Sequence, residues 1–270
     1  MKETVILLAV VILLGATGLI QAQEPELHGV VDVTYQSKYI WRGFDVYGDK
    51  SAIQPSIDLD LYGTGFGASV TGHRANSSGF EELERWDYNL YYQNALFGEE
   101  SYATYYRVGW VYYMFPDLND EWNDLQEMHG ILSWPKICPA GIVPTYILVK
   151  LWPHSSDSFA GSKSPMGGTA SGFAHIFMLD YGLHIAGLVP DIPEHILNLH
   201  AELVFNDGVG PGGQVVDHDW SNAVFGVSTD FDLGNNFTFT PGVYHQITMD
   251  SSVNDDKDET WAILGVKYNF

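Results

Sequence analysis

The sequence predicts an all-β protein, a transmembrane antiparallel up-and-down β-barrel of about 12 strands. Three observations lead to this prediction. Short segments of alternating apolar and polar residues recur along the chain, as half-buried strands require. Beyond the N-terminal signal, no stretch of about 18 continuous apolar residues provides a spanning helix. Aromatic residues make up 14% of the chain and 28 residues are glycine, which suits the aromatic girdles and tight strands of such barrels.

Residues 1–22 are predicted to be a secretory signal peptide. Lys2 precedes an apolar run from Val5 to Leu14, and Ala22 follows as the last residue before cleavage. The run is short for a membrane anchor, and no basic stop-transfer cluster follows it. Since no change of composition divides the remainder, residues 23–270 are expected to form one barrel in a bacterial outer membrane.

The last strand is predicted at Glu259–Phe270. From Ala262 to Phe270 the even-numbered residues form a wholly apolar face, whereas the odd-numbered face carries Lys267 and Asn269. In a membrane this strand must pair with the first, because an open sheet edge is not tolerated in lipid. The terminal Phe270 also resembles the signature that ends bacterial outer-membrane proteins. That resemblance implies recognition by the outer-membrane assembly machinery.

The first strand is predicted to run from Val31 to Arg42. Within it, Thr34–Gly43 resembles the Ser-x-Tyr-x-(Trp/Phe)-Arg-Gly entry strand of the TorF-type porin family of bacterial outer-membrane proteins. The resemblance continues through Ala52–Asp58, Phe225–Phe231 and the closing strand. It implies a barrel and a transport role, but it carries over no site.

The second strand has the clearest alternation, with Asp58 and Asp60 opposite Ile57, Leu59 and Leu61. A wet lumen tolerates such acids, and a packed sandwich core does not. The other strands are predicted at 66–74, 83–96, 102–115, 126–134, 142–152, 172–181, 195–206, 220–231 and 236–249. Connections at 43–50, 75–82, 116–125, 153–171, 207–219 and 250–258 would be outer loops, and the alternate connections are mostly short turns. Pro135–Gly141 and Gly182–Glu194 are long for turns.

Charged residues on the polar strand faces are the candidate pore lining. This set comprises Asp32, Lys38, Arg42, Asp58, Asp60, Arg85, Asp87, Arg107, Glu202, Asp230 and Lys267, with Glu127 and Lys150 on the same predicted face. Acids and bases nearly balance in it, so most of the net charge of −22 lies in loops and turns. The set has two interpretations: a polar channel lining, or a salt-bridged network that plugs a narrow barrel.

No cofactor or metal site is predicted. His195 and His200 fall on opposite strand faces, His218 lies in a loop, and no Cys/His spacing resembles a zinc site. The acid-rich loops 119–124 and 254–259 lack an EF-hand pattern, which favours solvated loops over calcium sites. The single Cys138 has no disulfide partner. The strongly negative charge also argues against nucleic acid as a partner.

A hydrolase is the main enzymatic alternative, and it needs a serine beside a histidine. Ser69 and His73 share a strand face but lie about 13 Å apart at the rise of a strand, so no catalytic pair is predicted. The sequence therefore favours a non-enzymatic, porin-like channel for passive diffusion of small hydrophilic solutes or ions through the outer-membrane lipid. A structural, adhesive or plugged barrel remains the alternative. The Ser- and Gly-rich loop 153–171 is expected to be flexible.

Overall fold

The computed structural model describes residues 26–118, 124–154, 171–190, 192–208 and 218–270. The predicted signal peptide and nearly all of the loop 153–171 lie outside the described residues. Within the described ranges, no helix has the length and apolar character needed to cross a membrane.

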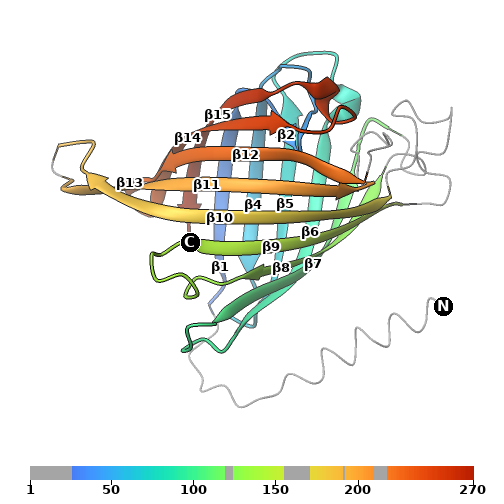
Figure 1. The fold of residues 1–270 in the computed structure, drawn as a ribbon. Coiled ribbons are helices and arrows are strands. Elements are labelled where there is room, and N and C mark those ends of the chain that lie inside the picture. The colour runs from blue at the N-terminus through green and yellow to red at the C-terminus, as the bar shows by residue number, and fades with distance from the viewer. Residues whose placement is uncertain (1–25, 119–123, 155–170, 191, 209–217) are drawn as a thin grey trace.

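Twelve antiparallel strands form a closed barrel, which confirms the predicted fold class (Figure 1). Each strand pairs with its neighbours in the chain, and the pairings of β1 with β15 and β12 with β14 complete the ring. A short strand, β13 (Phe231–Gly234), adds to β14. The wall strands are β1 (His28–Gln36), β4 (Ala52–Asp60), β5 (Phe66–Ala75), β6 (Arg85–Leu96), β7 (Thr104–Met114), β8 (Leu125–Ser133), β9 (Val143–Pro153), β10 (Gly172–Ala186), β11 (Glu194–Asp207), β12 (Asp219–Thr229), β14 (Phe237–Thr248) and β15 (Glu259–Asn269).

The first and last strands close the barrel as the sequence predicts. Their register runs from Val30 opposite Asn269 to Gln36 opposite Ile263. Phe270 extends the pairing, because its backbone N–H and C=O exchange hydrogen bonds of 3.0 Å with Gly29. The end of the barrel with the short turns is called the turn side below, and the opposite end is called the loop side.

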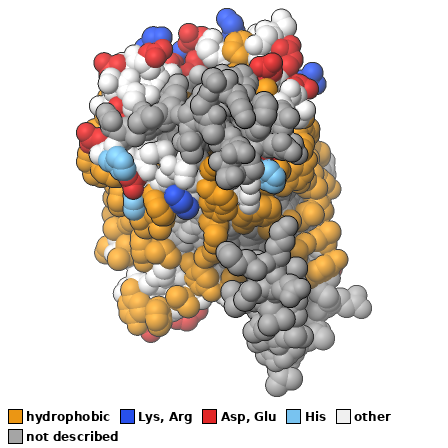
Figure 2. All heavy atoms as spheres, turned by 90° about the vertical axis from the view of Figure 1, so that its right-hand side faces the viewer, with side chains coloured by type: hydrophobic (Ala, Val, Ile, Leu, Met, Phe, Trp, Pro, Cys, Tyr) orange, Lys and Arg blue, Asp and Glu red, His pale blue; other side chains and the backbone are white. Residues whose placement is uncertain are grey.

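The outer surface of the wall is apolar. Val31, Val33, Leu90, Phe225 and Val266 belong to a large set of exposed hydrophobic side chains on the strands. Figure 2 shows hydrophobic side chains over the middle of the visible wall and charged side chains gathered at one end. An apolar belt around a closed sheet is the exterior of a membrane-spanning barrel.

The path of the chain after β1 differs from the predicted first strand. The strand ends at Gln36 instead of Arg42, and residues 37–50 fold into the barrel as what we call the lumen hairpin. It contains the two-residue strands β2 (Ile40–Trp41) and β3 (Phe44–Asp45). Arg42 and Gly43 turn the chain between them with φ of 50° and 94°. The predicted outer loop 43–50 is therefore wrong over most of its length: Gly43, Phe44 and Tyr47 are buried, and only Gly48, Asp49 and Lys50 are exposed.

The long connection around Gly182–Glu194 is partly strand. β10 continues to Ala186 and β11 begins at Glu194, in register with each other. The pairing of β9 with β10 ends at Asp180, so the last part of this β-hairpin extends beyond β9 on the turn side (Figure 1). At its end, the backbone N–H of Gly187 donates a hydrogen bond of 3.0 Å to the carbonyl of Pro193.

Candidate functional site in the barrel interior

The lumen hairpin packs into the loop-side half of the interior. Tyr39, Phe44 and Tyr47 are buried, with exposed fractions of 3%, 5% and 0%. Tyr47 donates a hydrogen bond of 2.9 Å from its hydroxyl to the backbone carbonyl of His73. Tyr39 stacks on the His73 ring with 5.0 Å between ring centroids. Contacts with the wall therefore fix both arms of the hairpin.

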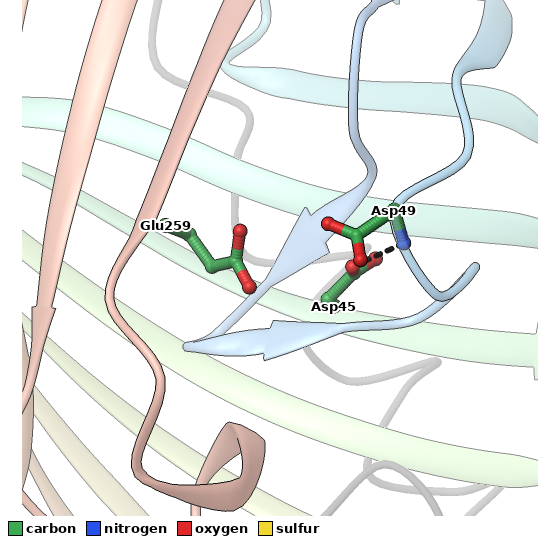
Figure 3. Close-up of side chains that lie close together, drawn as sticks. All are labelled: Asp45, Asp49 and Glu259. Carbon is green, nitrogen blue, oxygen red and sulfur yellow. Dashed lines mark hydrogen bonds between the residues drawn. The ribbon is translucent and has the colours of Figure 1, made fainter.

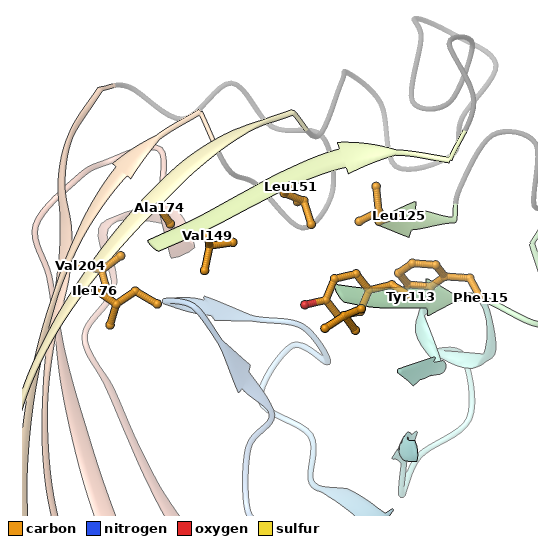
Figure 4. Close-up of a cluster of buried hydrophobic side chains, with 9 residues drawn as sticks. Tyr113, Phe115, Leu125, Val149, Leu151, Ala174, Ile176 and Val204 are labelled. Carbon is orange, nitrogen blue, oxygen red and sulfur yellow. The ribbon is translucent and has the colours of Figure 1, made fainter. Parts of the chain in front are cut away.

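An apolar cluster on the inner wall receives the hairpin. Trp41 packs against it, and its ring lies edge-on to Tyr113 with 5.8 Å between centroids. Figure 4 shows the cluster on the inner surface of the strands, with the hairpin ribbon beside it. Inward apolar residues are unusual for a wet lumen, and here Trp41 of the hairpin packs against them. The cluster consists of Val111, Tyr113, Phe115, Leu125, Val149, Leu151, Ala174, Ile176 and Val204.

Two arginines surround Trp41 at the tip of the hairpin. The guanidinium carbons of Arg42 and Arg85 each lie 4.8 Å from the centre of the Trp41 ring, a cation–π distance. Arg42 donates a hydrogen bond from Nη2 to Glu127 Oε2 at 2.5 Å. The Tyr113 hydroxyl donates to the same carboxylate oxygen at 2.6 Å. The tip thus carries one cation, which a carboxylate of the wall neutralises.

Lys38 ties the base of the hairpin to the wall. Its ammonium group lies 2.5 Å from Asp49 Oδ1, at the other end of the hairpin, and 2.6 Å from Glu259 Oε2 on β15. The hydrogen bonds from Lys38 to Asp49 and Glu259 raise the pKa of its ammonium group. Lys38 in turn lowers the pKa of Asp49. The three residues form a charged clamp that holds both hairpin ends beside β15.

Asp45, Asp49 and Glu259 are the one group of acids in the described ranges whose carboxylates lie close enough to share a metal ion. Figure 3 shows Asp49 and Asp45 facing Glu259 across the base of the hairpin. The Lys38 ammonium group already sits against two of these carboxylates. The backbone N–H of Asp49 donates to Asp45 Oδ2 at 2.5 Å. The Lys38 ion pairs and this backbone hydrogen bond explain the close approach of the three carboxylates without a metal ion.

A polar chain crosses four wall strands, β1, β4, β5 and β6, beside Tyr39. Gln36 donates to Gln54, whose amide lies 2.8 Å from His73 Nδ1, and His73 Nε2 lies 2.9 Å from Asp87. Asp87 also accepts from Arg85 at 2.6 Å. These partners engage both ring nitrogens of His73. Ser69, the serine of the hydrolase alternative, contacts Asn89 instead, at 3.4 Å.

The turn-side half of the interior is open and acidic. A cavity of about 640 Å³ lies at this end, lined by residues that include Asp60, Gln93, Arg107 and Ser133. Strand register places six acids on the inward face or at the rim of this half, which we call the inner vestibule. The bases Arg107 and Lys267 face them, so four negative charges are in excess. The acids are Asp32, Asp58, Asp60, Asp180, Glu202 and Asp230.

Hydroxyl groups hold several vestibule carboxylates in place. Tyr91 donates to Asp58 at 2.5 Å, and Thr240 donates to Asp230 at 2.5 Å. Arg107 stacks over the Tyr91 ring at 4.0 Å. A wall of this kind has fixed charges and room for water, which is what a polar conduit requires.

The structure separates the predicted lining residues into two groups. Lys38, Arg42, Arg85 and Asp87 meet at the lumen hairpin, and Glu127 joins them. Asp32, Asp58, Asp60, Arg107, Glu202, Asp230 and Lys267 belong to the inner vestibule.

Lys150 is a correction to the predicted inward set. It stands in register with Met128 and Phe173, both exposed on the outer face, and its ammonium group lies 4.4 Å from the Phe173 ring. The polar face of a barrel strand is expected to point inward. In β9 the inward residues at the level of the hairpin are apolar, so the polar Lys150 points outward instead.

Sequence reasoning missed four contributors to the interior. Trp41 and Tyr39 were assigned to the wall, and Gln246 and Asp180 were not considered. The Arg42–Gly43 and Gly48–Asp49 pairs were the available signal, because glycine marks turns within an otherwise strand-like pattern. Gln246 donates to the backbone carbonyl of Gly43 at 2.7 Å, a contact with no local sequence signature.

Comparisons with known proteins place the fold among outer-membrane barrels. No family model and no curated protein matches the sequence. Solved structures do match over most of the chain. The KdgM porin in complex with disordered oligogalacturonate is 12% identical with a TM-score of 0.51, covering 89% of this chain and 99% of that one. The NanC porin is 11% identical with a TM-score of 0.52, covering 88% and 98%.

A third structure, the COG4313 outer membrane channel from Pseudomonas putida F1, is 10% identical with a TM-score of 0.51 and covers 93% of this chain and 100% of that one. At these identities the likeness concerns the fold alone. The protein therefore shares the fold of twelve-stranded outer-membrane β-barrels.

Proposed function

We propose that the protein is an outer-membrane channel for passive diffusion of small hydrophilic solutes or ions. In this orientation the loop side faces the exterior and the turn side faces the periplasm. The observation that carries the proposal is the inner vestibule, where fixed charges and a cavity of about 640 Å³ occupy the turn-side half of a closed barrel. A barrel that only displays loops has no need of a hydrated, charged interior.

The structural neighbours support the same proposal. Two of them are porins and the third is an outer membrane channel. The TorF-type resemblance of Thr34–Gly43 remains a prediction that points in the same direction. We further propose that the channel has no enzymatic role, since Ser69 and His73 have separate partners.

A plugged barrel is the second candidate, and the lumen hairpin favours it. Hairpin residues contact the wall from β5 and β6, at His73 and Arg85, to β14 and β15, at Gln246 and Glu259. At the tip, Arg42 reaches Glu127 on β8, five strands from β1 in the ring, so the hairpin crosses the loop-side half of the interior. In the channel proposal the same hairpin forms the constriction.

Liposome swelling in isosmotic sugar solutions tests the proposal. The refolded protein is compared with a variant in which residues 37–51 are replaced by Asn-Gly, a turn that suits adjacent antiparallel strands. Gln36 and Ala52 are paired neighbours, so this short link spans the gap. We expect slow swelling with the native chain and fast swelling with the variant. A folded variant that admits no sugar would overturn the channel proposal.

A further inference from the structure

The lumen hairpin is attached to the wall at two places of different character. At its base, Lys38 bridges Asp49 and Glu259, and Ser37 exchanges hydrogen bonds of 2.9 Å with the backbone of Ala262. At its tip, residues 40–45, Arg42 pairs with Glu127 across the lumen. The base continues directly from β1, whereas the tip reaches strands far away in the ring.

The charged wall groups that contact the tip have other partners as well. Glu127 retains the hydroxyl of Tyr113 at 2.6 Å and the ring of His129 at 3.3 Å when Arg42 leaves. Arg85 retains Asp87, which also contacts His73. These wall groups keep hydrogen-bond partners when the tip leaves, which reduces the penalty for breaking the buried ion pair.

The docked tip itself is incompletely bonded. Buried polar atoms around it have no hydrogen-bond partner in the part of the chain that the structure describes: Nη1 of Arg42, Nδ2 of Asn222 and Oε1 of Gln246. Such groups regain hydrogen bonds in water, so undocking offsets part of its own cost. The base shows no orphaned atom on Lys38, Asp49 or Glu259.

We propose that the tip of the lumen hairpin is a gate that swings between a docked, closed position and an undocked, open one. The clamp of Lys38, Asp49 and Glu259 is the hinge, and the Arg42–Glu127 pair is the latch. This inference rests on the proposed channel function. It assigns the closed state to the arrangement seen here and the open state to loss of one ion pair and of the Trp41 contact with the apolar cluster.

Single-channel recording of the refolded full-length protein tests the gate. Glu127→Gln keeps the shape of the side chain but removes the charge that holds Arg42. We expect open probability to rise roughly tenfold or more, as for loss of a charge-assisted hydrogen bond. Arg42→Gln breaks the same pair from the other side and serves if the first variant does not refold. Asp255→Asn is the control, since that acid is exposed and its ion pair is with Lys257.

A cross-link provides an independent readout. In a Cys138→Ser background, Trp41→Cys and Tyr113→Cys place thiols on the tip and on the wall, and a short bis-methanethiosulfonate joins them through two disulfides. Openings are expected to cease on cross-linking and to return on reduction. Conductance that ignores both the latch variants and the cross-link would overturn the gate and leave the channel standing. Absence of conductance even after replacement of residues 37–51 would instead overturn the channel proposal.

Discussion

At the residue scale, the direction of each strand side chain decides whether a charge is tolerated. Val266 and Leu264 lie on the outer face of β15, and Lys267 and Ile263 lie on the inner face. Successive side chains point to opposite faces, so one residue contacts lipid and the next contacts the lumen. This contrast can be measured on adjacent positions of one strand.

Leu264→Lys should destabilise the barrel by about 2–4 kcal/mol, because it places an ammonium group against lipid near the middle of a strand. Ile263→Lys, the matched control, adds the same group on the lumen face and should cost much less. Equilibrium unfolding by urea in lipid vesicles gives both values. Equal costs at the two positions would contradict the assigned register.

The hinge clamp should respond to pH at both extremes. Asp49 has a lowered pKa, so its contribution is present above its ordinary value of 3.8 and is lost as the pH falls through the lowered value. Lys38 has a raised pKa, so its contribution is present below its ordinary value of 10.5 and is lost as the pH rises through the raised value. Near neutral pH the clamp is intact.

Hydrogen exchange of the hairpin amides, corrected for intrinsic rates, should therefore accelerate in acid below the ordinary Asp pKa. The Asp49→Asn variant should already exchange faster at neutral pH, because Lys38 then has only Glu259. An acid response as large in this variant as in the native chain would assign the effect to other carboxylates.

At the element scale, the lumen hairpin depends on one glycine. Gly43 has φ of 94°, and a Cβ atom there would lie 2.7 Å from Asn222 Oδ1 and 2.9 Å from Val253 Cγ1. Any larger residue must therefore push the tip away from β12 and from the loop that follows β14. Gly48 shares a positive φ of 53°, but its nearest neighbour would be a Phe80 ring carbon at 3.9 Å.

Gly43→Ala should undock the tip, whereas Gly48→Ala should leave it docked. Both substitutions carry a backbone cost of about 1–2 kcal/mol for a left-handed residue, so the comparison isolates the clash. Solvent accessibility of Ile40→Cys, a tip position that leaves Trp41 in place, to a charged thiol reagent in a Cys138→Ser background reports the position of the tip. Labelling rates that rise equally in both variants would mean that strain, and not the clash, controls docking.

The hairpin also shows where sequence reasoning reaches its limit. The barrel, its closure and most strand directions follow from alternation and from the need to satisfy the backbone in lipid. Tyr39 and Trp41 continue that alternation, so a hairpin packed in the lumen and a strand in the wall have the same local pattern. Only the partners distinguish them. Those partners, such as Glu127 and Gln246, lie 85 and 203 residues away from their hairpin contacts.

At the scale of the whole molecule, charges are distributed unequally along the lumen. The ion pairs at the hairpin neutralise Lys38, Arg42 and Arg85. The inner vestibule keeps an excess of acids. When all inward charges of the strands are added together, acids and bases nearly cancel. The sum therefore does not show that the bases lie mostly at the hairpin and the acids mostly in the inner vestibule. Because a low-dielectric wall focuses the field of such charges, the open channel should prefer cations.

Reversal potentials across a salt gradient measure that preference. Asp58→Asn, Asp180→Asn and Glu202→Gln together should reduce it strongly, because they lower the excess of vestibule acids from four to one. Neutralising the loop acids Asp255, Asp256 and Asp258 should reduce it only in dilute salt, where screening extends over about 10 Å. An anion preference in the native channel would mean that Arg42 and Arg85, not the vestibule, dominate the conduction path.

The central claim is that this barrel conducts and that the lumen hairpin limits conduction. Planar-bilayer conductance of the native chain beside the variant with residues 37–51 replaced by Asn-Gly tests it most directly. Both proteins must first show the heat-modifiable gel migration of a folded barrel. We predict brief, rare openings for the native chain and a large, steady conductance for the variant. A folded variant that conducts no better than the native chain would contradict the account.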